Sequence, residues 1–211
     1  MRHTSAWKRF GIAFVIAFAL AASPSAAFGA SGQLSGGCGS RTLEQPFLPW
    51  LDPASYVFAP NGGFESGSTD WTVAGGARVV SGNENFHVNS AGDAYALSLP
   101  AGGSATSRSI CVGTLDPTLR LFSVNSGSPL STLRVDVLFT DALGVSRTAT
   151  VGTVVNTSSW QPTSPIAFLA NLSSPPLITN GTTWVAFRFT AQGSLGGWKI
   201  DDVYVDPYKG G

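Results

Sequence analysis

Residues able to carry out acid–base or nucleophilic chemistry are scarce in this chain. Its two histidines are His3, near the N-terminus, and His87, in a stretch rich in Asn, Gly and Ser. No HExxH, GxSxG or phosphate-binding loop is present in the sequence. A Ser-His-Asp arrangement would have to use His87, and nothing nearby marks a nucleophile. A lone histidine of this kind is more typical of a loop than of a catalytic centre.

Paired carboxylates are the other arrangement to consider, because glycoside hydrolysis needs two of them facing one cleft, about 5–10 Å apart. Asp136 and Glu84 are the pair that could be assigned to this role. Asp136, however, alternates with Arg134 and is expected near Arg188 on another strand, so an ion pair across strands explains it better. The sequence favours a protein that is not an enzyme, and an unrecognised hydrolase remains the alternative.

Sugar binding requires an aromatic face for the pyranose ring and polar groups for the hydroxyls. Trp184 fits this role because it alternates with apolar residues and shares a strand face with Arg188. If that face is concave it forms a groove, which a loop could close. Alternatively, a helix, the other sheet or the proline-rich segment before residue 56 buries this face. The ligand-binding candidates are Trp184, Arg188, Arg134, Asp136 and Phe86.

The chain from Tyr56 onward reads as short strands separated by Gly, Asn, Pro or Asp. In two segments, 133–140 and 184–190, large apolar residues recur at every second position: Leu133, Val135, Val137 and Phe139 in the first, and Val185, Phe187 and Phe189 in the second. No segment keeps a 3.6-residue period over three turns. The fold class expected is all-β. The expected strands are 56–59, 71–74, 78–81, 94–99, 105–112, 118–124, 132–140, 146–155, 165–169, 183–191 and 198–205.

The last expected strand breaks its own alternation. Ile200 and Val203 are three residues apart, whereas Val203 and Val205 are two apart. If all three face the core, an extra residue must bulge at Asp201-Asp202. A bulge at the margin of a sheet re-aims a side chain, which suits a ligand position.

The N-terminus has the layout of a secretory signal peptide: a basic head, an apolar run over 10–22 and small residues after it. We expect a signal peptide over 1–29, cleaved after Ala27 or Gly29, and hence a secreted, extracellular protein; an uncleaved anchor is the alternative. Cleavage would leave nine basic and 12 acidic residues, a net charge of −3, which disfavours nucleic acid and anionic membranes as partners. An irregular tether packed on the domain (30–55), a β-sandwich domain (56–207) and a C-terminal tail (208–211) would follow.

Two cysteines, Cys38 and Cys111, remain after the signal peptide. In an exported protein such a pair most simply forms a disulfide, which here would tie the tether to the sandwich. The alternative, a reactive thiol or a metal ligand, has no CxxC motif or nearby histidine to support it.

Several short motifs resemble the galactose-binding-like jelly rolls. They are Asn-Gly-Gly-Phe-Glu at 61–65, a Trp six residues later (Trp71), and Ile-Asp-Asp-Val-x-Val at 200–205. The likeness covers about residues 61–207 and is closest to the carbohydrate-binding modules attached to secreted xylanases and laminarinases. It implies a jelly-roll β-sandwich and a non-catalytic module whose partner is a polysaccharide or cell-surface glycan. A structural or surface-interaction protein built on the same shell is the alternative function.

The resemblance also implies a structural Ca²⁺ where the first strand meets the last. Matched residue by residue, its carboxylates would be Glu65 and Asp202, with Asp93 as a further candidate. Backbone carbonyls would complete the six to eight oxygens that Ca²⁺ takes. The alternative is that Glu65 and Asp202 accept hydrogen bonds from backbone amides, without a metal.

Overall fold

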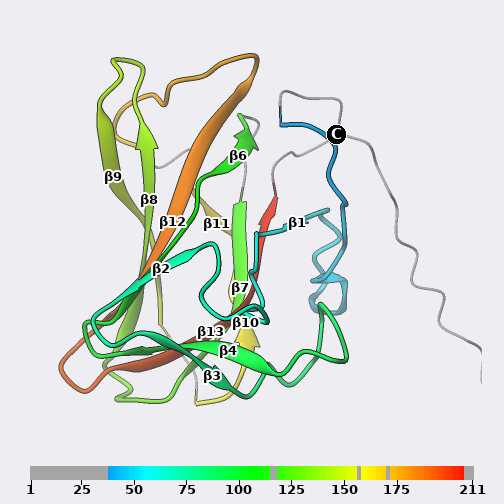
Figure 1. The fold of residues 1–211 in the computed structure, drawn as a ribbon, viewed down its shortest axis with the longest axis vertical. Coiled ribbons are helices and arrows are strands. Elements are labelled where there is room, and N and C mark those ends of the chain that lie inside the picture. The colour runs from blue at the N-terminus through cyan, green and yellow to red at the C-terminus, as the bar shows by residue number, and fades with distance from the viewer. Residues whose placement is uncertain (1–37, 115–117, 156–157, 170–171, 207–211) are drawn as a thin grey trace, which may run out of the picture.

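A computed structural model describes residues 38–114, 118–155, 158–169 and 172–206. The expected signal peptide with its cleavage site, the start of the tether and the C-terminal tail lie outside the described residues. The described residues form two antiparallel sheets that face each other (Figure 1), so the predicted all-β sandwich of jelly-roll type is confirmed. No helix among them is long and apolar enough to cross a membrane.

The first sheet has the strand order β10-β7-β13-β4-β3, with β1 also paired to β13 and β11 also paired to β7. Its short strand β10 was not expected from the sequence. The strands are β1 (Val57–Phe58), β3 (Arg78–Ser81), β4 (Tyr95–Pro100), β7 (Thr118–Asn125), β10 (Gln161–Pro162), β11 (Ile166–Ala167) and β13 (Gly197–Asp206).

The second sheet has the order β2-β5-β12-β8-β9, with β6 also paired to β12. The single strand expected over 105–112 is in fact two, β5 and β6, because the chain turns away at Arg108-Ser109 and both halves pair with β12. The strands are β2 (Trp71–Ala74), β5 (Ser104–Ser107), β6 (Ile110–Gly113), β8 (Thr132–Thr140), β9 (Ser146–Val154) and β12 (Thr182–Gln192).

The main core lies between the two sheets and follows from the alternation in β8 and β12. The apolar residues of both strands point inward, and Val137 and Phe187 are among those with no exposed surface. Trp71 and Trp198 are buried there too. Because side chains alternate across a strand, the polar residues of β8 and β12 must face outward.

The predicted bulge in the last strand is confirmed. The register of β13 against β7 shifts between Asp201 and Tyr204, and Asp202 takes a left-handed φ of 44°. The extra residue restores the alternation, so Ile200, Val203 and Val205 all face the core.

The tether, residues 38–55, packs on the outer face of the first sheet. Main-chain hydrogen bonds join Glu44 to Tyr56 in both directions, and the short 3-10 helix η1 (Leu48–Trp50) follows Phe47. Phe47 is fully buried among rings that include Phe122 of β7 and Tyr204 of β13.

The predicted disulfide is also confirmed, since Cys38 is bonded to Cys111 of β6. Cys38 thereby fixes the tether to the second sheet, while Phe47 and Trp50 fix it to the first.

Candidate functional site

The outer face of the second sheet carries four of the five ligand-binding candidates. Trp184 and Arg188 alternate with the core residues of β12, and Arg134 and Asp136 alternate with those of β8. The Trp184 side chain is 61% exposed. Among the described residues, the start of the tether lies beside Trp184 at the Cys38–Cys111 disulfide, and Phe47 and Trp50 pack on the other sheet. The tether therefore borders this face and leaves Trp184 exposed.

Asp136 holds the polar residues of this face together. Its Oδ2 accepts hydrogen bonds from Arg134 Nε (3.1 Å) and from Arg188 Nε (3.1 Å) and Nη2 (2.9 Å), and its Oδ1 accepts one from Thr150 Oγ1 at 2.7 Å. The carboxylate is almost fully buried, whereas about a third of each arginine side chain is exposed. The ion pair across strands expected for Asp136 and Arg188 is therefore present.

The fifth candidate, Phe86, lies elsewhere. Its ring packs against Trp50 at 4.9 Å and Phe122 at 5.7 Å between centroids, on the outer face of the first sheet. Phe86 therefore belongs to the tether's aromatic cluster and does not close a groove beside Trp184.

Glu84 does not form a catalytic pair with Asp136. It follows β3 in the first sheet and is fully buried, and its carboxylate accepts the amide hydrogens of Phe86 and Val88. Asp136 lies on the second sheet, so the two carboxylates do not face one cleft. Each has a structural role within its own sheet.

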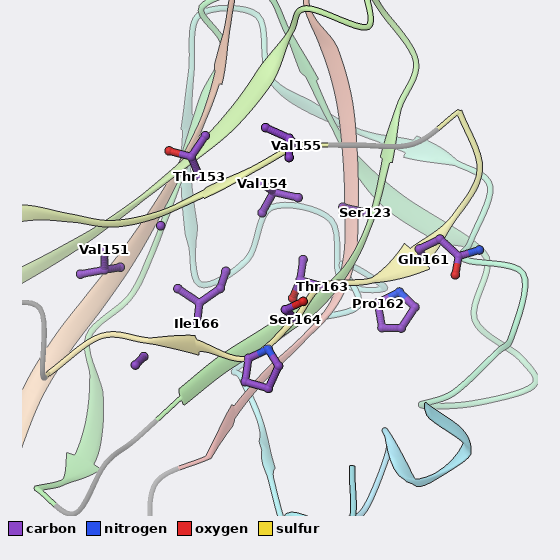
Figure 2. Close-up of a pocket in the computed structure, with 13 residues that line it drawn as sticks. Ser123, Val151, Thr153, Val154, Val155, Gln161, Pro162, Thr163, Ser164 and Ile166 are labelled. Carbon is purple, nitrogen blue, oxygen red and sulfur yellow. The ribbon is translucent and has the colours of Figure 1, made fainter. Parts of the chain in front are cut away.

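A cavity of about 550 Å³ opens at the side of the sandwich, between β9 and the segment 161–167. Figure 2 shows Val151 and Val154 of β9 on one side and Pro162 and Ile166 on the other. Its lining contains neither a charged residue nor an aromatic ring. It offers hydroxyl groups but no stacking surface, so it suits a sugar less well than the face around Trp184.

Buried carboxylates cluster at the bulge of β13. Asp201 accepts the Glu84 amide through Oδ2, and Asp202 accepts the Asn89 amide through Oδ2 at 3.2 Å. Burial, reinforced by the charge of Asp202, raises the pKa of Asp201 to about 9. Burial and the charges of Glu84, Asp93 and Glu65 raise the pKa of Asp202 to about 7, despite the hydrogen bond from Asn89. The part played by Glu84 at this bulge could not be predicted from the sequence, because it depends on the loop over 84–89 folding back onto Asp201.

The metal candidates Glu65, Asp93 and Asp202 all lie around this bulge. Asp202 Oδ1 is buried and accepts no hydrogen bond. Asp93 Oδ2 lies on the same side, because a Cβ on Gly63 would come within 3.0 Å of Asp202 Oδ1 and 3.8 Å of Asp93 Oδ2. Glu65 Oε1 accepts the amides of Ala94 and Tyr95, both at 2.9 Å.

These contacts include the amide hydrogen bonds of the metal-free alternative, but they leave Asp202 Oδ1 without a donor. A hard cation is the partner that such an unpaired, buried carboxylate oxygen fits. Within the described part of the chain, no three side chains of the His, Cys, Asp and Glu types converge into a metal site by themselves. Main-chain carbonyls would therefore have to supply most of the coordination.

The glycines beside this site are required by close packing and not by an unusual backbone conformation. Neither Gly62 nor Gly63 has a positive φ. Gly62 instead packs against β13 so closely that a Cβ would lie 2.8 Å from the Val203 carbonyl oxygen, and its own carbonyl accepts the Val203 amide. The motif thus joins the start of the fold to the bulge of the last strand.

Comparisons with known proteins agree with this fold. No model of a known protein family matches the chain, and no curated protein matches it either. A solved structure of bacteriophage CBA120 tailspike protein 4, its enzymatically active domain, is similar with a TM-score of 0.50 and 16% identity; the match covers 71% of this chain and 21% of that one.

Carbohydrate-binding modules are also among the similar structures. TmCBM61, solved in complex with β-1,4-galactotriose, has a TM-score of 0.44 and 18% identity, and the match covers 72% of this chain and 98% of that chain. The CBM22-1 xylan-binding domain of Paenibacillus barcinonensis Xyn10C has a TM-score of 0.47 and 15% identity over 71% of this chain and 94% of that chain. The predicted resemblance to carbohydrate-binding jelly rolls is confirmed for the fold. At these identities the likeness does not extend to a ligand.

Proposed function

We propose that this chain is an exported, non-catalytic polysaccharide-binding module that stacks a sugar ring on Trp184 and holds a structural Ca²⁺ at Asp202. Export is supported by the disulfide, because such bonds persist in oxidising compartments. The sugar site and the calcium site are separate parts of the proposal, and each has its own test.

The observation that carries the sugar site is the exposure of Trp184. A large aromatic side chain that is 61% exposed on a sheet face offers an apolar plate of the kind that sugar rings stack on. All the other described tryptophans are wholly or partly buried: Trp71 and Trp198 in the main core, and Trp50 and Trp160 against the aromatic cluster under the tether. Trp184 is therefore the tryptophan available to a ligand.

The arginines beside Trp184 supply the polar part of such a site. Arg188 lies four residues further along β12, roughly 13 Å from Trp184 at the usual rise per residue. Asp136 holds both Arg134 and Arg188 in place, yet each guanidinium keeps N–H groups that this carboxylate does not use. A chain of sugars laid along β12 would meet a stacking surface first and fixed hydrogen-bond donors next.

The sugar site is tested by measuring retention of the protein on galactan, xylan, glucan and mannan, followed by the same measurement on Trp184→Ala. Loss of the stacking contact should weaken binding at least tenfold. Tyr95→Ala is the matched control, because Tyr95 is a 43% exposed aromatic residue on β4 of the other sheet. A protein that binds no polysaccharide, or a Trp184→Ala variant that binds as well as the parent, would contradict the proposal and favour a structural role.

The calcium site is tested by thermal unfolding with added Ca²⁺ and with a chelator. Calcium at about 100 times its Kd would stabilise the fold by about 2.7 kcal/mol, or roughly 5–10 °C in Tm. Asp202→Ala and Glu65→Ala should each remove that shift. Asp70→Ala should keep it, because Asp70 pairs with Arg108 just before β2. A parent protein whose Tm ignores both calcium and chelator would rule out the site.

A further inference from the structure

A pocket of about 300 Å³ lies beside Trp184, where the tether passes from the second sheet towards the first. We call it the Arg41 pocket. Parts of the chain that are distant in sequence form its walls: the tether, β1, the turn between β5 and β6, and β12. The residues that carry the argument are Arg41, Arg108, Trp184, Cys38 and Cys111.

The Cys38–Cys111 disulfide forms one wall of this pocket and holds the tether beside Trp184. Cys111 lies directly opposite Trp184 in the pairing of β6 with β12, so the two side chains share the outer face of the sheet. The bond from Cys111 to Cys38 holds the tether next to the indole, and Arg41 follows three residues later. The tether precedes the region that resembles known sugar-binding modules, so this pocket is an addition to the shared fold.

The charge of the pocket is positive. Its lining includes two arginines and no carboxylate. Arg108 Nη1 donates to Asp70 Oδ1 at 3.1 Å, whereas Arg41 Nη1 is buried and has no acceptor in the described residues. Burial lowers the pKa of the Arg41 guanidinium, and no neighbouring acid offsets that effect.

A buried guanidinium nitrogen without an acceptor is costly, since it has lost water and gained no partner. The other two arginines on this side, Arg134 and Arg188, already share Asp136. An anion entering the pocket would give Arg41 the acceptor that it lacks. A planar guanidinium forms its strongest hydrogen bonds with groups that offer two oxygens, such as a carboxylate or a sulfate.

We infer that the Arg41 pocket binds the anionic substituent of an acidic polysaccharide, a carboxylate or a sulfate ester, while the sugar ring that carries it stacks on Trp184. This inference rests on the proposed sugar site and narrows its ligand to charged polymers. The chain remaining after the expected signal cleavage has a net charge of −3, so overall attraction does not bring a polyanion to it. Recognition must come from the pocket itself.

The test is affinity electrophoresis of the exported full chain against matched pairs of polymers. Polygalacturonate is compared with its fully methyl-esterified form, and dextran sulfate with dextran, so that the carboxylate and the sulfate are tested separately. The variants are Arg41→Gln and Trp184→Ala. Arg78→Gln is the control, because Arg78 is an exposed arginine on β3 of the other sheet.

The parent should bind at least one charged polymer about tenfold or more tightly than its uncharged partner. Arg41→Gln should abolish that preference, Trp184→Ala should weaken binding to both members of the pair, and Arg78→Gln should change nothing. Thermal unfolding of Arg41→Gln supplies a second readout. Its Tm should equal or exceed that of the parent, because no hydrogen bond or ion pair within the described residues is lost, whereas a structural role for Arg41 would lower it.

The outcomes separate this inference from the function on which it rests. Equal binding to charged and uncharged polymers, with Trp184 still required, would overturn the inference and leave the sugar site standing. A charge preference that survives Arg41→Gln would also overturn it. Failure to bind any of the four polymers, or the neutral polysaccharides above, would overturn both.

Discussion

The outer faces of the two sheets differ in whether their aromatic side chains are covered. The first sheet places Phe122 and Tyr204 on its outer face, and the tether covers them with Phe47, which has no exposed surface. The second sheet places Trp184 on its outer face and leaves it 61% exposed. The tether thus covers the aromatic residues on one outer face, while Trp184 on the other outer face is exposed to solvent.

The difference lies in the neighbours of each aromatic residue. On the first sheet the guanidinium of Arg120 packs on the cluster, 4.1 Å from the Phe47 ring centroid, and pairs with Asp52 of the tether. On the outer face of the second sheet Arg134 and Arg188 pair with Asp136 of their own sheet. Charged groups therefore hold the tether on the first sheet, whereas on the second sheet they form a polar surface that the tether does not cover.

The largest effect should come from substituting one aromatic residue on each face. Phe47→Ala should lower the free energy of unfolding by about 3–5 kcal/mol, because it opens a cavity in a fully packed cluster. Trp184→Ala should change it by about 0.5 kcal/mol or less, because the indole is mostly in solvent. Chemical denaturation measures both.

The same two variants should have the opposite order of effects on sugar affinity. Phe47→Ala should keep the affinity of the folded protein, and Trp184→Ala should lose it. A Trp184→Ala variant as unstable as Phe47→Ala would show that the outer face of the second sheet is also structural, and the contrast between the faces would fail.

A somewhat smaller effect is expected from removing the disulfide, which links the closed face to the open one. The bond spans 73 residues, and the chain-entropy model assigns a loop of that size about 4 kcal/mol at most. A Cys38→Ser, Cys111→Ser double variant should therefore be less stable by about 2–4 kcal/mol. Chemical denaturation compared with the oxidised parent measures this difference.

The double variant should also lose any preference for charged polymers, because Arg41 is no longer held beside Trp184, while binding that depends on Trp184 alone should remain. Reduced parent protein is the control and should match it. If the preference for charged polymers survives, the tether holds its position without the bond, and the disulfide contributes stability only.

The sequence predicted the closed sandwich because its signals are local. Alternation in β8 and β12 identified which residues face inward, and the spacing of Ile200, Val203 and Val205 identified the bulge. Strand boundaries were mostly within one or two residues of those in the structure. The disulfide was predictable too, because Cys38 and Cys111 are the only cysteines.

The sequence could not assign the outer faces, because alternation states which side a residue faces and not what covers that side. Phe86 was predicted to close the groove beside Trp184 from a loop, and its ring lies instead against Trp50 of the tether. Arg41 was missed although a signal existed, since it follows Cys38 by three residues and the predicted bridge brings it to Cys111. The lack of a hydrogen-bond acceptor for its guanidinium could not be predicted, because it depends on tertiary packing and not on the local sequence.

The smallest effect on stability is expected from Asp52, the tether residue that pairs with Arg120 of the first sheet. Burial alone would raise the pKa of the Asp52 carboxyl, but hydrogen bonds from Tyr56, the Ala54 amide and Arg120 outweigh it and leave the pKa below its usual 3.8. A carboxyl whose pKa is lowered on folding stabilises the protein above the unfolded value, and this contribution disappears as the pH falls through the folded value. Asp52→Asn should therefore cost about 1–2 kcal/mol near neutral pH.

That difference between Asp52→Asn and the parent should shrink as the pH falls from about 6 to about 2.5, because protonation removes the same charge in the parent. Urea unfolding at a series of pH values measures it. Asp141→Asn is the control: hydrogen bonds from the Val145 amide and Arg147 lower the pKa of Asp141 in the turn between β8 and β9, away from the tether. Hydrogen exchange over residues 44–56 should therefore quicken in Asp52→Asn and stay unchanged in Asp141→Asn. If the difference in unfolding free energy between Asp52→Asn and the parent stays the same at low pH, the rings around Phe47, and not the Asp52 charge, hold the tether on the first sheet.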